Sequence, residues 1–225
     1  MHEIIDGWRS FLAEGVKTSF DIGQHLAPTE LEAIKAWAGF SGEAKHLGTA
    51  TMGSAYQFGD KVLKITKDSS EANAAAVLIG EEHPNVYKIY AVGRLPGRSQ
   101  WVIVSEFLMS SDKEMRFAAK EMYNKRNIKK DYYNWGGVEE TSPREQKILS
   151  ALTSFAPPGF DKEQIKQYVD QIATGLTHLA SKGITFTDIK PSNIMNKDGQ
   201  AAIIDVGRAG VKEYVDIPEI SLDIL

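Results

Sequence analysis

The sequence predicts an α+β protein in which a β-rich amino-terminal part precedes a helical part. Short apolar runs bounded by Gly, Pro and Asp turns fill residues 47–107 and are typical of strands. A long amphipathic pattern follows Asp161 and indicates a helix. Residues 183–207 return to short strands around a polar loop. With 225 residues, 42% of them hydrophobic, the chain can bury a core as one domain or as one domain split into two lobes.

Composition excludes several classes of protein. A net charge of −4 provides no general attraction to nucleic acid or to an anionic membrane. The absence of cysteine excludes a disulfide framework and a thiolate zinc site. No apolar run approaches membrane-spanning length, and the start of the chain, MHEIIDGWRSF, is too polar for a secretory signal. We therefore expect a soluble, cytoplasmic protein with neither a nucleic-acid nor a membrane partner.

Residues 1–44 predict two amphipathic helices, the second of which begins at Pro28. Their apolar residues at helical spacing are Ile4, Ile5, Trp8, Phe11 and Leu12, then Leu31, Ile34 and Trp37. Because such stripes mostly face a core, a helical cap packed on the following lobe is the favoured interpretation. An arm that docks a partner is the alternative.

Residues 47–66, LGTATMGSAYQFGDKVLKIT, predict a glycine-rich hairpin followed by a strand. Tyr56 and Phe58 alternate with polar residues, and Gly59-Asp60 turns the chain into the apolar run that contains Lys64. This lysine is either a functional cation or a strand-edge residue whose ammonium group reaches water. Two further strands are expected, at Val86–Val92 and Trp101–Phe107.

Residues 68–80 predict a short alanine-rich helix, for which Ser69 or Ser70 is the expected N-cap. Glu71 is the acidic residue in the body of this helix. The helix dipole alone favours a glutamate in a first turn, so Glu71 has a structural explanation as well as a functional one.

Residues 109–160 predict a charged helical insertion that ends at Ala156-Pro157-Pro158-Gly159. The stretch DKEMRFAAKEMYNKRNIKKDYYNW mixes basic and aromatic residues, a composition that also occurs in nucleic-acid-binding patches. Because acidic residues are interleaved and the whole chain is acidic, a solvated helical face is the favoured interpretation. This helical insertion can contact a protein substrate or a partner.

Asp161 is the expected N-cap of the long helix, and Gly183 lies past its carboxyl end. The apolar stripe of this helix consists of Ile165, Tyr168, Val169, Ile172, Leu176 and Leu179. His178 lies off the stripe and is interpreted as structural. The other histidines, His2, His25, His46 and His83, are expected to form no cluster.

A polar loop in residues 183–207 carries Asp188, Lys190 and Asn193, and the strand that follows ends on Asp205. The intervening hairpin turns at Asn196-Lys197-Asp198-Gly199. The sequence thus places one cation and two carboxylates near an amide. Phosphoryl transfer needs such a set, because it requires an acceptor for the nucleophile's proton, a cation for the moving phosphate and oxygen ligands for magnesium.

The segment TDIKPSNIM resembles the catalytic loop of protein kinases, and IIDVG resembles the metal-binding segment that follows it. The resemblance implies that Asp188 is the catalytic base and that Lys190 contacts the γ-phosphate. It further implies that Asn193 and Asp205 hold Mg²⁺. Because Lys190 lies two residues after the base, the resemblance is to the Ser/Thr-type kinases.

The match has departures. Phe186 and Thr187 stand where the family usually has His and Arg, and Val206 replaces a Phe. Thr187 removes the arginine that pairs with a phosphorylated activation loop, so control by activation-loop phosphorylation is not expected.

The resemblance extends to residues 47–108. It implies that Gly48 and Gly53 belong to the phosphate-binding glycine loop, in which Ala50 replaces the second glycine. Lys64 resembles the lysine that grips the α- and β-phosphates of ATP, and Glu71 the helix glutamate that pairs with it.

The strand WVIVSEFL resembles the one that enters the kinase hinge. Glu106 to Leu108 would present backbone groups to adenine. Ser105 would be the gatekeeper and would leave a roomy pocket behind the purine.

The resemblance implies a protein-kinase-like two-lobed fold, with a small β-rich N-lobe and a reduced helical C-lobe. The expected segments are a helical extension (1–44), the N-lobe and hinge (45–108), the helical insertion (109–160) and the reduced C-lobe (161–225). Few residues follow Gly207. In this respect the chain resembles the short kinases of bacterial effectors and bacteriophages.

The expected activity is that of an ATP-dependent Ser/Thr protein kinase that uses ATP and Mg²⁺. A protein is the expected substrate, and a host protein that completes or activates the reduced C-lobe is an expected partner, with the host cytoplasm as a possible location. Two alternatives stay open: a nucleotide-binding, pseudokinase-like module that acts by gripping a partner, and a small-molecule kinase.

Overall fold

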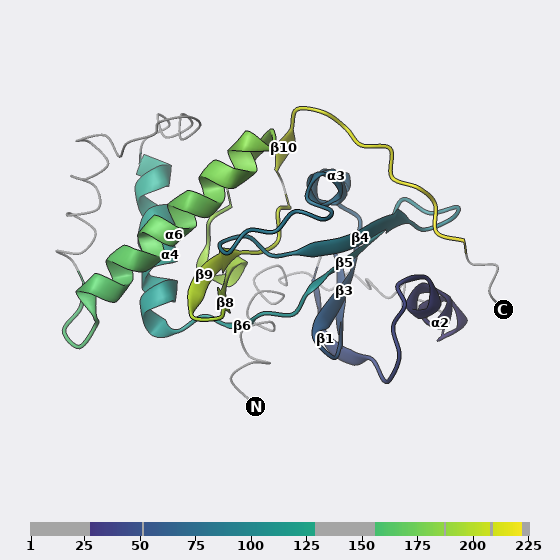
Figure 1. Cartoon of the computed structure of the whole chain (residues 1–225), viewed down its shortest axis with the longest axis horizontal. Coiled ribbons are helices and arrows are strands. Elements are labelled where there is room, and N and C mark those ends of the chain that lie inside the picture. The colour runs from purple at the N-terminus through teal and green to yellow at the C-terminus, as the bar shows by residue number, and fades with distance from the viewer. Residues whose placement is uncertain (1–27, 51, 129–155, 187, 208, 222–225) are drawn as a thin grey trace. The chain divides into compact units, whose positions relative to one another are not determined.

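The computed structural model describes residues 28–50, 52–128, 156–186, 188–207 and 209–221, which fall into two compact units. Unit 1 comprises residues 1–81, 88–107 and 214–225, and unit 2 comprises residues 82–87 and 108–213. Figure 1 shows the strands and helices of both. The predicted α+β class is confirmed, whereas the four-segment division of the chain stays a prediction.

Unit 1 contains a five-stranded antiparallel sheet with the strand order β1-β2-β3-β5-β4. Its strands are β1 (Lys45–Ala50), β2 (Gly53–Phe58), β3 (Lys61–Thr66), β4 (Ile89–Arg94) and β5 (Trp101–Glu106). The strand predicted from Val86 begins instead at Ile89. The reason is that Tyr87 lies in unit 2, where its backbone N–H donates to Ile203 O at 2.9 Å.

Helix α3 (Ser69–Val77) confirms the predicted alanine-rich helix but not its predicted cap. The N-cap is Asp68, whose Oδ1 accepts hydrogen bonds from the backbone N–H groups of Ser70 (2.9 Å) and Glu71 (3.3 Å). Asp68 has the extended backbone of a cap residue, with φ −86° and ψ 102°, while Ser69 already belongs to the helix. The prediction of Ser69 or Ser70 was therefore wrong by one or two residues.

Helix α2 (Pro28–Trp37) packs on the sheet of unit 1. It contributes Ile34 to a core cluster, with Leu31 and Trp37 packed against that cluster. The buried members of the cluster are Ile34, Phe58, Leu63, Ile65, Leu95, Val102 and Ile220. For α2 the structure thus shows the packing expected of a cap, while the first predicted helix lies outside the described residues.

In its described part, unit 2 combines two α-helices, a short 3₁₀ turn and two small sheets. The α-helices are α4 (Lys113–Ile128) and α6 (Lys162–Ser181), and the 3₁₀ turn is η2 (Pro191–Asn193). One sheet has the order β6-β8-β9, and in the other β10 pairs with β7. The strands are β6 (Met109–Ser110), β7 (Ile184–Thr185), β8 (Ile194–Lys197), β9 (Gln200–Ile203) and β10 (Gly210–Val211).

Helix α6 matches its prediction closely. Asp161 Oδ1 accepts from the backbone N–H groups of Glu163 (3.0 Å) and Gln164 (3.1 Å), and Gly183 follows the helix with a φ of +75°. A Cβ on Gly175 would lie 2.5 Å from Asn85 O, so this glycine lets residues 82–87 lie against the helix. In the predicted insertion, α4 is helical and residues 129–155 lie outside the described part.

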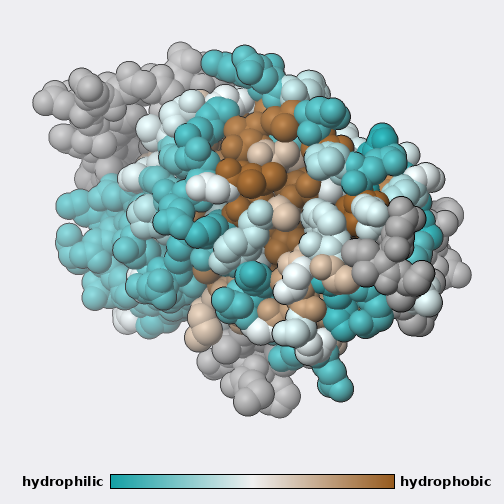
Figure 2. Space-filling view, turned by 45° about the vertical axis from the view of Figure 1, so that its right-hand side comes forward, coloured by the Kyte–Doolittle hydropathy of each residue, from teal (hydrophilic) through white to brown (hydrophobic). Residues whose placement is uncertain are grey.

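The surface is mostly hydrophilic on the face shown in Figure 2, where hydrophobic residues gather in one patch near the middle. The large hydrophobic side chains that are exposed in the described ranges are Met52, Ile79, Met109, Tyr214 and Val215. In the part of the chain that the structure describes, no helix has the length and apolar character needed to cross a membrane.

Candidate functional site

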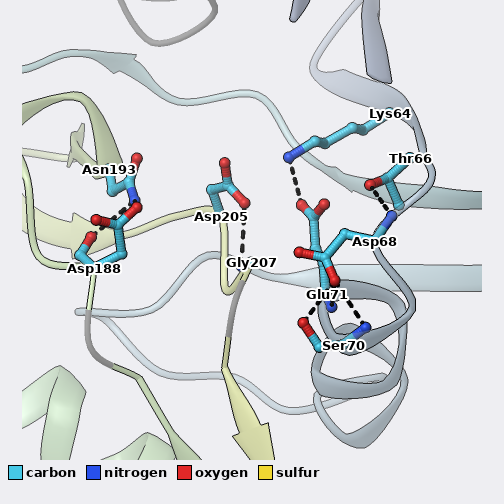
Figure 3. A network of polar contacts seen from close by, with 9 residues as sticks. All are labelled: Lys64, Thr66, Asp68, Ser70, Glu71, Asp188, Asn193, Asp205 and Gly207. Carbon is cyan, nitrogen blue, oxygen red and sulfur yellow. Dashed lines mark hydrogen bonds and ion pairs between the residues drawn. The ribbon is translucent and has the colours of Figure 1, made fainter. Parts of the chain in front are cut away.

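The predicted site residues fall into two groups, one in each unit, and each group is described by itself. In unit 1, the group consists of the glycine hairpin, Lys64, Glu71 and the end of β5. In unit 2, it consists of Leu108, the loop from Asp188 to Asn193 and the turn at Asp205. Figure 3 shows Lys64 and Glu71 of the first group and Asp188, Asn193 and Asp205 of the second.

Lys64 and Glu71 form an ion pair in unit 1 (Figure 3). Lys64 lies on β3, which is flanked on both sides by β2 and β5, so it is not a strand-edge residue. The side chain of Glu71 is 3% exposed and that of Lys64 is 16% exposed. Because a buried carboxylate is unfavourable without its cation, this pair holds the lysine side chain in one orientation.

Two glycines predicted to bind phosphate lie in the β1–β2 hairpin. A Cβ on Gly53 would lie 1.8 Å from the carbonyl oxygen of Ile65, which is closer than any real contact. The approach of the β3 backbone therefore explains this glycine without a nucleotide. Gly48 pairs with Ala55 just after a register shift in β1. Contact of either glycine with phosphate stays a prediction.

The end of β5 is tied to the segment before β4. The backbone N–H of Glu106 donates to Lys88 O at 3.0 Å, and the Glu106 carboxylate accepts from the Lys88 N–H at 2.6 Å. Ser105 is buried, and its hydroxyl lies 3.4 Å from Glu106 O. The sequence did not suggest this role for the Glu106 side chain. The contacts of Glu106 and Leu108 with adenine stay predictions.

In unit 2, Asp188, Lys190 and Asn193 come together in one short loop (Figure 3 shows the first and the last). The Asn193 side-chain N–H donates to the Asp188 carbonyl at 2.8 Å and lies 3.4 Å from Asp188 Oδ2. Lys190 Nζ lies 3.4 Å from the same carboxylate oxygen. The backbone N–H of Asn193 donates to Lys190 O at 2.9 Å and closes the η2 turn. The loop is therefore held by bonds among its own residues.

This arrangement gives each side chain a chemical role. An ionised carboxylate is a pure acceptor, and the Asp188 side chain is 25% exposed, so it can receive a proton from a hydroxyl group. Asn193 is 1% exposed, and its side-chain N–H group donates to Asp188. Its Oδ1 is therefore the atom that can bind a metal ion. The same Oδ1 lies 3.4 Å from the Ser192 hydroxyl.

Asp205 lies just past β9 in a left-handed backbone conformation, with φ +53°. Outside glycine this conformation is uncommon, although Asp and Asn adopt it more readily than other residues, and Asp198 at a hairpin turn has it too. The Asp205 Oδ1 accepts from Gly207 N–H at 3.2 Å (Figure 3). The preceding residue, Ile204, donates its N–H to Asn193 O at 2.9 Å. The chain leading to Asp205 is thus bonded directly to the loop that carries Asn193.

The oxygen donors of Asn193 and Asp205 fit a magnesium ion. Mg²⁺ prefers carboxylate and carbonyl oxygens and keeps several waters, so one or two protein ligands are sufficient. Among the described residues, no three His, Cys, Asp or Glu side chains gather closely enough to hold a metal ion. The donor set is therefore compatible with magnesium but not with a zinc centre built from several protein ligands.

Two histidines, His83 and His178, form a stacked pair in unit 2. The rings of His83 and His178 have centroids 4.4 Å apart and an interplanar angle of 17°. Lys197 Nζ donates to the carbonyls of His83 and Val86, at 3.2 Å each. Burial, with smaller contributions from His178 and Lys197, lowers the pKa of His83. The sequence did not predict this pair, because no sequence spacing relates the two residues. His178 keeps the structural role predicted for it.

Two predicted features lie wholly or partly beyond what the structure describes. Thr187 is outside the described residues, and only the backbone of Ala50 is described, where it pairs with Gly53. Phe186 and Val206, which replace the usual residues of the two motifs, are both buried. The core positions around the loop are therefore filled by apolar side chains.

Comparison with known proteins shows which family the sequence matches. A sequence model described as the protein kinase domain matches residues 61–215. G protein-coupled receptor kinase 2 of Drosophila melanogaster is 43% identical over 63 residues, which is 28% of this chain and 8% of that protein. G protein-coupled receptor kinase 1 of Caenorhabditis elegans is 41% identical over 59 residues (26% and 9%). Ribosomal protein S6 kinase alpha-1 of Homo sapiens is 40% identical over 58 residues (25% and 8%). The matched segment thus spans less than a tenth of each relative.

Proposed function

We propose that this chain, which belongs to the protein kinase family, transfers the γ-phosphate of ATP to serine or threonine hydroxyls of a protein. The observation that carries the proposal is the loop in which Asp188 is held by Asn193 and faced by Lys190. The partial matches to G protein-coupled receptor kinases and ribosomal protein S6 kinases support a protein as the substrate. Lys190, two residues after the base, supports Ser/Thr specificity.

In the proposed reaction, Asp188 accepts the proton of the substrate hydroxyl as its oxygen attacks the γ-phosphorus. A new oxygen–phosphorus bond forms, the bond between the γ-phosphorus and the β,γ-bridging oxygen breaks, and ADP leaves. The hydrogen bond from Asn193 orients Asp188, because it holds the backbone carbonyl of that residue. Lys190 stabilises the negative charge of the phosphoryl group in transfer.

Lys64 binds the α- and β-phosphates in this proposal. An ammonium group has three N–H donors, so one lysine can bind a carboxylate and phosphate oxygens at the same time. Asn193 and Asp205 would hold Mg²⁺, which supplies neutralisation of the phosphate charge when bound. Gly48 and Gly53 would cover the phosphates, and the backbone of Glu106 and Leu108 would bind adenine.

A second candidate function is a nucleotide-binding module that acts by gripping a partner protein. Two observations favour it: Ala50 replaces a loop glycine, and close packing of the sheet already explains Gly53. In either case we propose a cytoplasmic protein, without activation-loop phosphorylation control because Thr187 replaces the pairing arginine. We further propose that a host protein activates the chain and that the chain comes from a bacterial effector or a bacteriophage.

The test is phosphate transfer from labelled ATP, with Mg²⁺, to a generic basic protein, comparing the wild-type chain with Asp188→Asn. Removing a general base lowers the rate by about 10²- to 10⁴-fold. Asp198→Asn is the matched control, because Asp198 is exposed at a hairpin turn with φ +52°, a conformation that asparagine tolerates. If Asp188→Asn transferred phosphate as fast as the wild-type chain, the assignment of Asp188 as the base would be contradicted. Nucleotide binding without transfer would favour the binding module.

A further inference from the structure

The last rung between strands β4 and β5 uses a side chain in place of a backbone group. Ile89, where β4 begins, pairs with Ser105 of β5. At the next position the Glu106 N–H donates to Lys88 O at 3.0 Å. In a regular antiparallel pair the opposite residue returns a second bond, here from the Lys88 N–H to the main-chain carbonyl of Glu106. The Lys88 N–H donates instead to Glu106 Oε1, at 2.6 Å.

The carboxylate of Glu106 therefore stands in for the Glu106 main-chain carbonyl in the ladder. A carboxylate accepts more strongly than a neutral carbonyl oxygen and makes shorter hydrogen bonds, as the 2.6 Å distance to Lys88 N illustrates. Because the Lys88 N–H points at the side chain, this donor does not compete for the main-chain oxygen. The Ser105 hydroxyl approaches that oxygen only to 3.4 Å.

The backbone around Glu106 fixes the direction of its carbonyl within unit 1. Glu106 is the partner of Lys61 on β3, and the next residue, Phe107, donates its N–H to Asp60 O at 2.8 Å. Successive residues of an antiparallel strand point their backbone groups alternately to the two sides. Since Phe107 faces the β3 side, the N–H and C=O of Glu106 face the side on which Lys88 lies.

A structural explanation of the carboxylate is that it ends the ladder where the chain leaves the sheet. Ending the ladder does not need a carboxylate, because the Glu106 main-chain oxygen would satisfy the Lys88 N–H equally well. The side chain adds one thing: the Lys88 N–H is not given to the main-chain oxygen. The exocyclic 6-amino group of adenine is a donor that such an oxygen can accept.

We propose that the Glu106 carboxylate is a positioning residue for adenine: it binds the Lys88 N–H so that the main-chain oxygen of Glu106 accepts from the 6-amino group of the purine. This inference rests on the proposed nucleotide-binding function and deepens it, because it assigns recognition of the base to a side chain that acts through the backbone. Without the carboxylate, the Lys88 N–H completes the ladder at the Glu106 carbonyl and displaces the 6-amino group.

The test compares the dissociation constants of ATP and purine riboside triphosphate, which is ATP without the 6-amino group, both with Mg²⁺ and the full chain. We expect the wild-type chain to bind ATP more tightly by about three- to tenfold, which corresponds to one hydrogen bond, and Glu106→Ala to bind the two nucleotides equally. The affinity of Glu106→Ala for purine riboside triphosphate should stay at the wild-type value, because that nucleotide makes no bond to the carbonyl.

Two variants control the comparison. Glu106→Gln keeps a side-chain oxygen that can accept from the Lys88 N–H, so it should restore most of the preference for ATP. Glu43→Ala removes the same kind of side chain from an exposed position of unit 1 and should keep the wild-type preference. If Glu106→Ala lost affinity for both nucleotides in equal proportion, Glu106 would serve only the fold and the proposal would be overturned.

The inference and the proposed function fail in different ways. Equal binding of the two nucleotides by the wild-type chain would overturn the role of the Glu106 carbonyl and leave phosphate transfer standing. A wild-type chain that binds neither nucleotide would overturn the proposed function itself. Should Glu106→Ala fail to fold, Glu106→Asp, whose carboxylate is one methylene shorter, lowers the preference for ATP by a smaller factor. A wild-type preference in Glu106→Asp would then overturn the inference.

Discussion

The two charged groups of the candidate site are held in different ways. The Lys64–Glu71 pair joins a central strand to a helix and is almost completely buried. The group around Asp188 lies within six residues of one loop, is partly exposed and is closed by its own hydrogen bonds. The first group depends on the packing of unit 1, whereas the second depends mainly on local backbone geometry. A substitution in the first should therefore change stability as well as activity, and one in the second should mainly change activity.

The largest effect on stability is expected from Lys64→Met, because it leaves the Glu71 carboxylate buried without its lysine. Breaking a buried pair in this way lowers the free energy of unfolding by about 3–5 kcal/mol. Urea denaturation measures the change. Lys61→Met is the control, since this lysine lies on the same strand and its ammonium group is 4.8 Å from the Tyr90 ring centroid, a contact worth about 0.5–1 kcal/mol.

The double variant Lys64→Met/Glu71→Leu sharpens the same test. Replacing both members of a buried ion pair by apolar residues restores much of the lost stability. Phosphate transfer should stay low, because the cation for the phosphates is gone. Recovery of transfer in the double variant would show that Lys64 serves only the fold.

A smaller effect on stability is expected from Asn193→Ala. This change removes the hydrogen bond to the Asp188 carbonyl from a buried position, which lowers the free energy of unfolding by about 1–3 kcal/mol. Phosphate transfer should fall much further than this loss of stability explains. Asn124→Ala, at an exposed position on α4, is the control for thermal unfolding and for transfer. If Asn193→Ala lowered the free energy of unfolding as much as Lys64→Met does, the two groups would not differ in how they are held.

The smallest effect is expected from acid, and it should be confined to unit 2. The pKa of His83 is lowered in the folded state, by burial first and then by His178 and Lys197. Neutral His83 therefore makes its full contribution to the free energy of unfolding above the unfolded pKa of about 6.5. This contribution declines as the pH falls from there towards the lowered folded pKa. Hydrogen exchange of residues 82–87 should accelerate across that window.

The control for this pH effect is His178→Phe, which keeps a stacked ring and removes the second titrating group. It should reduce the acid sensitivity of residues 82–87 without abolishing it, because burial of His83 remains. Exchange around Lys64 should not change across the same window. Equal acceleration in both units would contradict an origin at the histidine pair.

Particular elements show how far sequence reasoning reached. Helix α6 was predicted with its cap and stripe, because Asp161 and the apolar period of its residues are local signals. The β-hairpins were predicted from turn residues in the same way. The cap of α3 was assigned one residue late, because Asp68, Ser69 and Ser70 are all good caps and only the backbone angles distinguish them.

The sequence by itself determined the α+β class and the kinase motifs, since these depend on neighbours a few residues apart. Through the resemblance to kinases it also predicted that Lys64 pairs with Glu71, which the structure confirms. Only the tertiary structure decided that His83 stacks on His178, that Gly53 is needed for the approach of Ile65, and that Ile220 fills the core beside Gly93. These contacts join residues that no periodicity relates. They depend on which side chains fill the space left by the packing of the strands and helices, and a pattern of single residues does not encode that space.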